Sequence, residues 1–234
     1  MGKINKMNNV TIVIAIKNRP KEDTIKYLEA LKNQTYKHDL IVVDYGSDEE
    51  HLGWERVLSV IYKFKLIEVK RNTDIFNSGR ALNIGFKQVK TPYIITTDGD
   101  VLLSSQVVEK AMDYLTHADC IVFCQRFDLN ENGTIGKMHP KNAIGTFLGF
   151  SKEWILKING VDEYFEGYGG WDNDMKHRAE ADKLEVIWLN ELENIVILHM
   201  WHTTRVHIKM GENIKYLKQN KPVIRNVGKE WGEL

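Results

Sequence analysis

The sequence predicts an α/β fold in which a mainly parallel central sheet is flanked by helices. Short apolar runs rich in β-branched residues recur between turn residues, at 10–16, 40–44, 66–70, 93–98 and 120–124. Their nearly continuous apolar character is typical of strands that are covered on both faces. Segments with helical spacing separate these runs, and this alternation implies right-handed crossovers between parallel strands. Ligands bind such sheets at the carboxyl ends of the strands.

The first predicted helix, from Pro20 to Asn33, shows the expected start and stop signals. Proline suits the first turn of a helix, and Glu22 and Asp23 suit the positive N-terminal end of the helix dipole. Apolar residues then recur at three-residue steps, at Ile25, Leu28 and Leu31. Similar spacing predicts further helices in the first half of the chain, at 51–64, 78–89 and 105–116.

The second half of the chain is less regular. The stretch from 126 to 146 has no clear period, so we expect a long loop that borders the functional site. We expect its part from 130 to 146 to close over the bound substrate and exclude water. A helix at 172–182, strands at 185–189 and 194–201 and a short helix at 211–219 follow it. Helical spacing assigns three further apolar side chains to the core, namely Trp154, Ile155 and Ile158.

The chain of 234 residues has the size of one domain, 1–234, and shows no repeat or linker. We divide it into two halves, about 10–125 and about 126–202, and a polar C-terminal tail, 203–234. The 32 basic and 32 acidic residues cancel, which excludes a general affinity for nucleic acid or for an anionic membrane. No apolar run reaches the length of a transmembrane helix, so we expect a cytoplasmic protein. Cys120 and Cys124 share one short apolar run and are expected to be buried thiols.

Polar residues follow several predicted strands at the point where each strand ends. Asp98 and Asp100 flank Gly99 directly after the fourth strand, and two carboxylates so placed can hold a divalent cation that bridges a diphosphate. Alone, such a triplet is also typical of a turn with solvated acids. The ends of the other predicted strands carry cations, an acid, amides and small turn residues. They are Lys17, Asn18, Arg19, Asp44, Gly46, Ser47, Arg71 and Asn72. This combination suits a nucleotide and a metal.

Three segments in order resemble one family of enzymes. They read IVVDYGSDEE, NSGRALNIGFKQVKTPYIITTDGD and INGVDEYFEGYGGWDNDMKHR, and the likeness extends from about Thr11 to His202. Together they resemble the glycosyltransferase family 2 type of GT-A fold, and within it the β-1,4-galactosyltransferase-like branch. The resemblance implies a nucleotide-sugar transferase, with a nucleotide-binding half at about 10–125 and an acceptor-binding and catalytic half at about 126–202.

The resemblance also implies roles on the donor side. Asp44 matches the position that contacts uracil or ribose, and Lys17 and Arg19 match contacts to the diphosphate. Asp98 matches the ribose-side acid, and Asp100 matches the metal ligand. The segment FNSGRALNIGF is similar to the family's start of a donor-side helix, which adds Asn77 and Arg80 to the donor-binding residues.

On the acceptor side, Asp172 matches the general base of the inverting members. Its alternative role is that of an N-cap for the helix beginning near 173, and both roles are compatible. The resemblance adds Tyr168, Gly169, Gly170 and Trp171 as acceptor contacts. Trp171 replaces the glutamate that is common in the family, and with Tyr168 it offers an aromatic platform for a sugar ring. Tyr45 stands where a second aspartate is common.

A histidine that completes the metal site is implied at the end of the last strand. Either His199 or His202 fits, with His199 favoured because HMW is similar to a run found in some relatives. Their three-residue spacing points them to opposite faces of a regular strand, so at most one is expected to reach the metal.

The function predicted is metal-dependent transfer of a hexose from a UDP-sugar to a hydroxyl of a sugar-containing acceptor, with inversion. The metal is Mn²⁺, or Mg²⁺. Two alternatives remain open, a nucleotidyltransferase acting on sugar phosphates and a non-catalytic carbohydrate-binding module. The first typically has a Gly-rich basic loop after the first strand, where this chain has AIKNRPKED, and the second would need only the aromatic residues.

Overall fold

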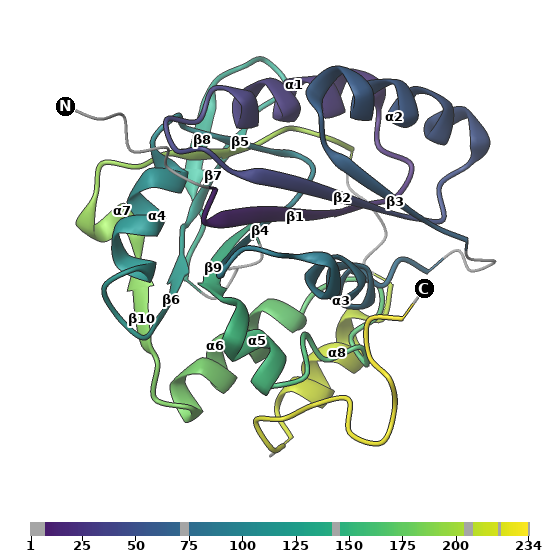
Figure 1. The fold of residues 1–234 in the computed structure, drawn as a ribbon. Coiled ribbons are helices and arrows are strands. Elements are labelled where there is room, and N and C mark those ends of the chain that lie inside the picture. Colours follow the sequence, from purple (N-terminus) through teal and green to yellow (C-terminus); the bar gives the residue numbers. More distant parts are fainter. Residues whose placement is uncertain (1–7, 71–74, 142–145, 204–207, 220, 234) are drawn as a thin grey trace.

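The computed structural model describes residues 8–70, 75–141, 146–203, 208–219 and 221–233. Arg71 and Asn72, which were expected to end a strand, lie outside these ranges. Within them the main sheet has the strand order β10-β6-β9-β4-β1-β2-β3 (Figure 1). Its strands are β1 (Val10–Ile16), β2 (Asp39–Tyr45), β3 (Lys65–Val69), β4 (Tyr93–Thr97), β6 (Cys120–Phe123), β9 (Phe147–Ser151) and β10 (Glu185–Trp188).

The pairing in this sheet is mainly parallel, as the sequence predicts. β1 pairs in parallel with β2 and β4, and β2 and β6 pair in parallel with β3 and β10. The exception is β9, which runs antiparallel to both of its neighbours, β4 and β6. The short strand β9 directly precedes a helix, and its pairing is tertiary, so the sequence pattern did not reveal it.

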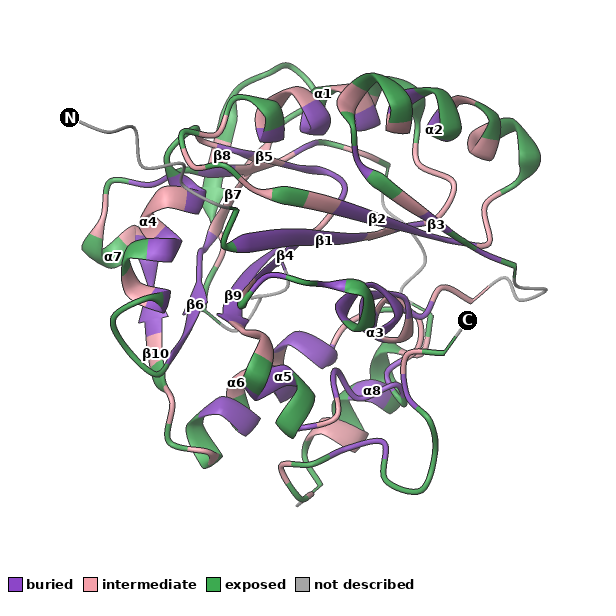
Figure 2. Cartoon of the chain, viewed as in Figure 1, coloured by how far each residue is buried: buried purple, intermediate pink, exposed green. Residues whose placement is uncertain are grey.

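Helices cover both faces of the sheet, and the core is divided accordingly. One apolar cluster joins β1 to helices α1 (Lys21–Lys32), α2 (Glu49–Tyr62) and α4 (Val107–Leu115). The other joins the opposite face to α3 (Ser78–Gln88), α5 (Lys152–Lys157) and α6 (Trp171–Ala181). Along β1, Ile12 and Ile14 belong to the first cluster and Val13 to the second, so the strand presents apolar side chains both ways. Figure 2 shows β1 buried along most of its length. The predicted core residues in α5 and the two cysteines are buried.

A second, smaller sheet lies where a long loop was expected. Its order is β5-β11-β7-β8, with the strands β5 (Val101–Leu103), β7 (Arg126–Leu129), β8 (Ile135–Met138) and β11 (Ile197–His199). The expectation of a structureless stretch from 126 to 146 is therefore wrong, because β7 and β8 form a hairpin there. Every residue of β7 is only part-buried, so the strand lacks an apolar period, and its parallel partner β11 lies far along the chain. The predicted strand 194–201 is reduced to three residues, after the short helix α7 (Leu189–Leu192).

The segment after α8 (Met210–Leu217) is part of the fold and not a loose polar tail. Arg225 and Trp231 are buried, with 8% and 7% exposure. The Arg225 guanidinium pairs with Asp162 at 3.1 Å and with Asp174 of α6 at 3.0 Å. Buried charges are tolerated only when they are paired, so these contacts tie the C-terminal segment to α6.

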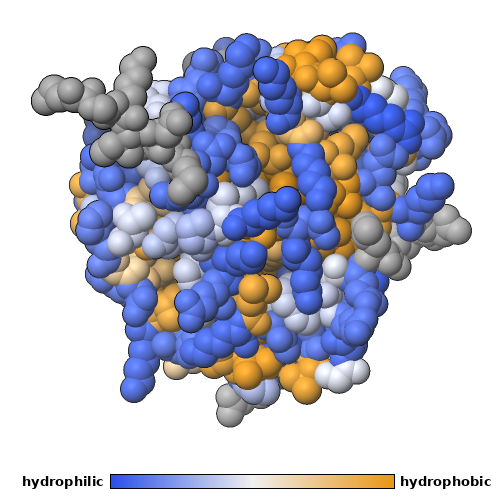
Figure 3. Space-filling view, viewed as in Figure 1, coloured by the Kyte–Doolittle hydropathy of each residue, from blue (hydrophilic) through white to orange (hydrophobic). Residues whose placement is uncertain are grey.

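On the face shown in Figure 3, hydrophilic side chains predominate, and part of the apolar surface gathers over α2. Val57, Val60 and Ile61 of α2 are exposed there. None of the described helices combines the length and the apolar character needed to cross a bilayer.

Candidate active site

The turn that follows β4 places two aspartates at the carboxyl edge of the sheet. The carbonyl of Asp98 accepts a hydrogen bond from the Val101 amide at 3.2 Å, which closes the turn. A Cβ on Gly99 would lie 2.9 Å from the Ile16 side chain, so glycine is needed here for close approach to the end of β1. Asp100 then enters β5 with its carboxyl 6% exposed.

Hydrogen bonds join the loop after β1 to the loop after β2. The Asn18 amide nitrogen donates to the Ser47 hydroxyl at 2.7 Å, and the Asp48 amide donates to the Asn18 side chain at 2.9 Å. Asn18 has a φ of 47°, which asparagine tolerates better than most residues. Asp44 is 1% exposed and accepts from both the amide, at 2.9 Å, and the hydroxyl of Ser47. These bonds fix the predicted nucleotide-binding loops before any ligand arrives.

The loop after β1 also places a cation, Arg19, beside the turn that holds Asp98 and Asp100, which we call the acidic turn. Arg19 and Asp100 form an ion pair in which the guanidinium is 14% exposed. Although burial opposes ionisation of Asp100, the charges of Arg19 and His199 hold its pKa below the usual range. Lys17 lies part-buried at the start of the same loop.

Two histidines and Asp100 form a cluster with the composition of a metal site. Asp100, His199 and His202 each offer one ligand atom, and these atoms all lie within 4.8 Å of one another. The His199 Nε2 is 3.8 Å from Asp100 Oδ1, and the His202 Nε2 is 3.6 Å from Asp100 Oδ2. Asp100 Oδ1 is buried and accepts no hydrogen bond from the described residues. An unsatisfied buried carboxylate oxygen beside two imidazoles fits a divalent cation.

The expectation that at most one histidine reaches the metal loses its basis here. It assumed a regular strand through both residues, but β11 ends at His199. The Met200 amide donates to the carbonyl of Asp100 at 2.8 Å, and the chain then leaves the strand. His202 therefore approaches from outside the sheet, and the two imidazole centroids are 5.1 Å apart.

Sequence reasoning missed Asp128, which supports His199. Asp128 in β7 lies opposite His199 in the parallel register, and its Oδ1 is 3.5 Å from His199 Nδ1. Asp128 also contacts His139 at 2.6 Å. A carboxylate at the distal nitrogen of a metal-binding histidine fixes the ring and its tautomer. The pairing of β7 with β11 creates this contact, and no local sequence signal announces it.

The predicted base, Asp172, lies near the acidic turn. Burial raises the pKa of Asp172, and hydrogen bonds from the backbone at the start of α6 oppose the rise. Burial first, and then the charge of Asp100, raise the pKa of Asp98. Asp172 is close enough to add to that rise, while Arg19 and Arg126 lower it. The site thus combines carboxylates with cations from separate strands.

The local fold at the start of α6 corrects one alternative for Asp172. The helix begins at Trp171 and its N-cap is Gly170, so Asp172 lies inside the first turn and is not the cap. Gly170 has a φ of 100°, and a Cβ there would lie 2.7 Å from the Phe165 ring. Only glycine fits this position, directly before the first turn of α6.

The predicted acceptor residues differ in accessibility. Trp171 is 8% exposed and packs in the core cluster with α3 and α5, so its indole does not form the expected sugar platform. Tyr168 is 45% exposed, so of these two aromatic residues it alone remains a candidate platform for a sugar ring. Gly169 lies between them, and nothing comes within 4 Å of the place a Cβ would take.

Two predicted donor residues have other surroundings. The Asn77 side chain caps α3 by accepting from the Arg80 amide at 2.8 Å, and its amide donates to the Glu163 carbonyl at 2.9 Å. Both of its polar atoms therefore serve the fold, which does not support a contact with the donor. Arg80 lies in the first turn of α3, and its Nε is buried without a hydrogen-bond partner among the described residues.

Comparison with known proteins identifies the family. Residues 11–176 match Glycosyl transferase family 2. The chain has no significant match among curated proteins. Several solved structures share its fold at low sequence identity, and three of them are described next.

The first is GalNAc-T7 with UDP, GalNAc and Mn²⁺, with a TM-score of 0.66 at 10% identity over 85% of this chain and 45% of that chain. The second is S. aureus TarS 1-349 with UDP-GlcNAc, with a TM-score of 0.66 at 14% identity over 87% and 61%. The third is the mannosyltransferase PcManGT from Pyrobaculum calidifontis with GDP-Man and Mn²⁺, with a TM-score of 0.67 at 15% identity over 92% and 66%.

The chain thus spans between 45% and 66% of the length of these proteins. Their likeness confirms the predicted GT-A fold, a central sheet flanked by helices. The family match covers most of the chain and agrees with the order of the motifs at the strand ends. This protein therefore belongs to glycosyl transferase family 2.

Proposed function

We propose that this protein is a metal-dependent glycosyltransferase that moves a hexose from a UDP-sugar to a hydroxyl of a sugar-containing acceptor, with inversion. The observation that carries the proposal is the cluster of Asp100, His199 and His202 beside the buried Asp172. Family 2 membership favours a transferase over a nucleotidyltransferase or a carbohydrate-binding module. The placement in the β-1,4-galactosyltransferase-like branch belongs to the same proposal, and a cytoplasmic location stays a prediction from the sequence.

The described residues divide the work of donor binding. Asp44, held by Ser47, is assigned to the nucleoside, and Asp98 to the ribose. Lys17 and Arg19 are assigned to the diphosphate, because a guanidinium binds phosphate oxygens through paired donors. Arg19 already pairs with Asp100 at the carboxyl edge of the sheet, where the donor phosphates are assigned.

Asp100, His199 and His202 would hold a divalent cation, Mn²⁺ or Mg²⁺. When bound, such a cation stabilises the negative charge of the departing nucleoside diphosphate. Asp128 keeps the His199 ring oriented toward Asp100. All of these groups are preformed, and preorganised charge is the largest contributor to catalysis in many enzymes.

Asp172 is assigned the role of general base. Its carboxylate accepts the proton of the acceptor hydroxyl as that oxygen attacks the anomeric carbon from the face opposite the leaving group. Burial raises the pKa of Asp172, which makes the carboxylate a stronger base. Tyr168 offers an exposed ring near the start of α6 on which an acceptor sugar can stack.

The test is a screen for nucleotide release with UDP-glucose, UDP-galactose, their N-acetylated forms and GDP-mannose, with MnCl₂ or with EDTA. We expect release with a UDP-sugar only when the metal is present. Asp172→Asn should lower turnover by about 10²–10⁴-fold and leave UDP affinity nearly unchanged. The control is Asp182→Asn at the other end of α6, which should keep full activity. Near wild-type turnover of Asp172→Asn would refute the assignment of the base.

A second arm tests the metal ligands. Asp100→Ala should remove the effect of MnCl₂ on UDP binding measured by calorimetry. If the titration curves of wild type with and without MnCl₂ coincide, the metal role is wrong. The anomeric configuration of the product, read by NMR, decides between inversion and retention.

A further inference from the structure

A cavity of about 670 Å³ lies at the edge of the sheet opposite the candidate active site. It is lined by the start of β1 and β2, the C-terminal ends of α1 and α2, and residues that follow α3. β1 has seven residues and is therefore about 20 Å long, which separates this cavity from the loop that carries Arg19. Its volume is in the range of small-ligand sites.

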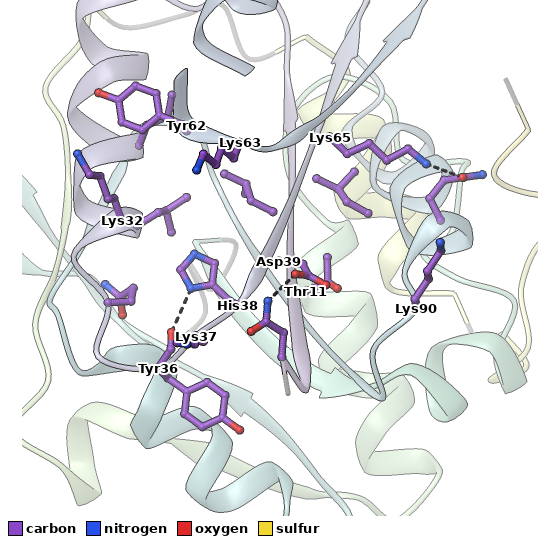
Figure 4. A pocket seen from close by; sticks show the side chains of 17 residues that line it. Thr11, Lys32, Tyr36, Lys37, His38, Asp39, Tyr62, Lys63, Lys65 and Lys90 are labelled. Atoms are coloured by element: carbon purple, nitrogen blue, oxygen red, sulfur yellow. Dashed lines mark hydrogen bonds between the residues drawn. The ribbon is translucent and has the colours of Figure 1, made fainter. Parts of the chain in front are cut away.

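The lining is strongly basic in a protein whose net charge is zero. Five lysines contribute to it, namely Lys32, Lys37, Lys63, Lys65 and Lys90. Figure 4 shows Lys32 and Lys63 on one side of the cavity and Lys65 and Lys90 on the other. The single lining carboxylate, Asp39, accepts a hydrogen bond from Asn8 at 2.6 Å.

Few of these positive charges are neutralised within the part of the chain that the structure describes. Lys32 lies 3.6 Å from Glu29, and Lys65 donates to the neutral Gln88 side chain at 2.7 Å. No ion pair joins Lys37, Lys63 or Lys90 to a described residue. Three lysine charges therefore face the cavity and its rim without a carboxylate partner.

The helix ends explain only part of this arrangement. Lys32 and Lys63 lie at the C-terminal ends of α1 and α2, where a cation is favoured by the helix dipole. Each helix end carries roughly half a unit of negative charge, so the ends of α1, α2 and α3 together do not cancel the lysines. Lys90 directly follows Val89, the C-cap of α3, whereas Lys37 lies four residues beyond the C-cap of α1, Asn33.

The remainder of the wall is apolar or neutral. Leu28, Leu31 and Ile41 form a buried floor, and the part-exposed Tyr62 ring lies beside Lys32. Burial lowers the pKa of His38, so this ring adds a neutral hydrogen-bonding group to the wall. An apolar floor with cations around the rim suits an organic ligand with negatively charged groups.

We propose that this cavity is a second ligand site that binds a small organic phosphate with at least two phosphate groups. Separate lysines around the rim contact separate phosphates, and the organic part rests on the leucine floor. The site is independent of the proposed transferase function, because it uses other residues at the other edge of the sheet.

The test measures binding of inorganic tripolyphosphate, pyrophosphate and phosphate by calorimetry in metal-free buffer. We expect tripolyphosphate to bind most tightly, and the triple variant Lys37→Gln, Lys63→Gln, Lys90→Gln to weaken it at least tenfold. The matched control changes three exposed lysines elsewhere, Lys183→Gln, Lys215→Gln, Lys218→Gln, and should stay within twofold of wild type. Both triple variants should melt like wild type, since these side chains are exposed.

A further variant separates this site from the candidate donor site. Arg19→Gln should leave tripolyphosphate binding unchanged. The proposal is overturned if wild type gives no binding, if both triple variants weaken it equally, or if Arg19→Gln abolishes it while the cavity variant does not. None of these results depends on whether the protein transfers a sugar.

Discussion

The buried carboxyl of Glu55 makes a sharp prediction about the pH dependence of stability. Glu55 lies on α2 with 1% exposure, and neither carboxyl oxygen accepts a hydrogen bond within the described residues. Burial, and next the neighbouring Asp44, raise the pKa of Glu55 from 4.5 to about 9. The group is therefore a neutral acid at pH 7, buried near the Asp44 carboxyl.

The sign of the effect follows from proton linkage. Between pH 4.5 and about 9 the folded state keeps a proton that the unfolded state has lost. The free energy of unfolding consequently falls as pH rises through this window, by about 1.4 kcal/mol per pH unit for one proton. Between pH 5 and pH 7 the loss amounts to about 3 kcal/mol, and it stops above the folded-state pKa.

Glu55→Gln removes the titrating group and keeps a neutral donor toward Asp44. We expect the free energy of unfolding of wild type minus that of the variant to fall steadily from pH 5 to pH 8. Urea unfolding at four pH values measures it, read by circular dichroism. The control is Glu68→Gln, because Glu68 pairs with Arg56 at the surface at 2.6 Å and its pKa is lowered. Its removal should cost about 0–1 kcal/mol at every pH in the range. A difference between wild type and Glu55→Gln that stays constant from pH 5 to pH 8 would refute the neutral, buried acid.

Three further predictions concern the site and its support. Asp128→Asn should weaken Mn²⁺ binding by about 10–100-fold in calorimetry, because the imidazole of a metal-binding histidine loses its carboxylate partner; equal affinity would remove Asp128 from the site. Gly170→Ala should lower the free energy of unfolding by about 1–3 kcal/mol. The control Gly53→Ala, in open space within α2, should raise it by up to about 1 kcal/mol. Equal effects of the two substitutions in urea unfolding would contradict the requirement for glycine at the start of α6. Asp174→Ala should cost about 3–5 kcal/mol in the same assay, because it leaves the buried Arg225 without one of its partners, and an unchanged midpoint would show that the pair contributes little.

The first half of the fold was predictable because its signals are local. The strands β1, β2 and β4 are buried over most of their length, so their apolar character is nearly continuous, and helical spacing separates them. The edge strand β3 exposes Lys65 and Glu68 but keeps a short apolar run. The predicted strand 93–98 and the helix 78–89 agree with β4 and α3 to within one residue at each end. Parallel pairing then brings Arg19 and Asp100 together, since both follow strands that end at the same edge.

The parts that were missed depend on contacts between distant segments. β7 has no apolar period, because its place is set by pairing with β11 about 70 residues later. Its pairing brings Asp128 to His199, and the end of β11 brings His202 to Asp100. The burial of Trp171 depends equally on the packing of α6 against α3 and α5. Motif likeness supplied the residue types, and tertiary pairing decided which of them meet.

The acidic turn explains why the chain holds cations from several strands at one place. Burial first, and then repulsion from Asp100 and from the nearby Asp172, raise the pKa of Asp98. Arg19 offsets part of this repulsion at Asp100, and Arg126 lowers the pKa of Asp98 from the β7 side. A divalent cation at Asp100 would take over that role, and it would leave the Arg19 guanidinium available to a donor phosphate. This exchange couples the binding of the metal to the binding of the donor. The metal frees Arg19 for the donor phosphate, and a phosphate that holds Arg19 leaves Asp100 free for the metal. Metal and donor should therefore bind more tightly together than alone.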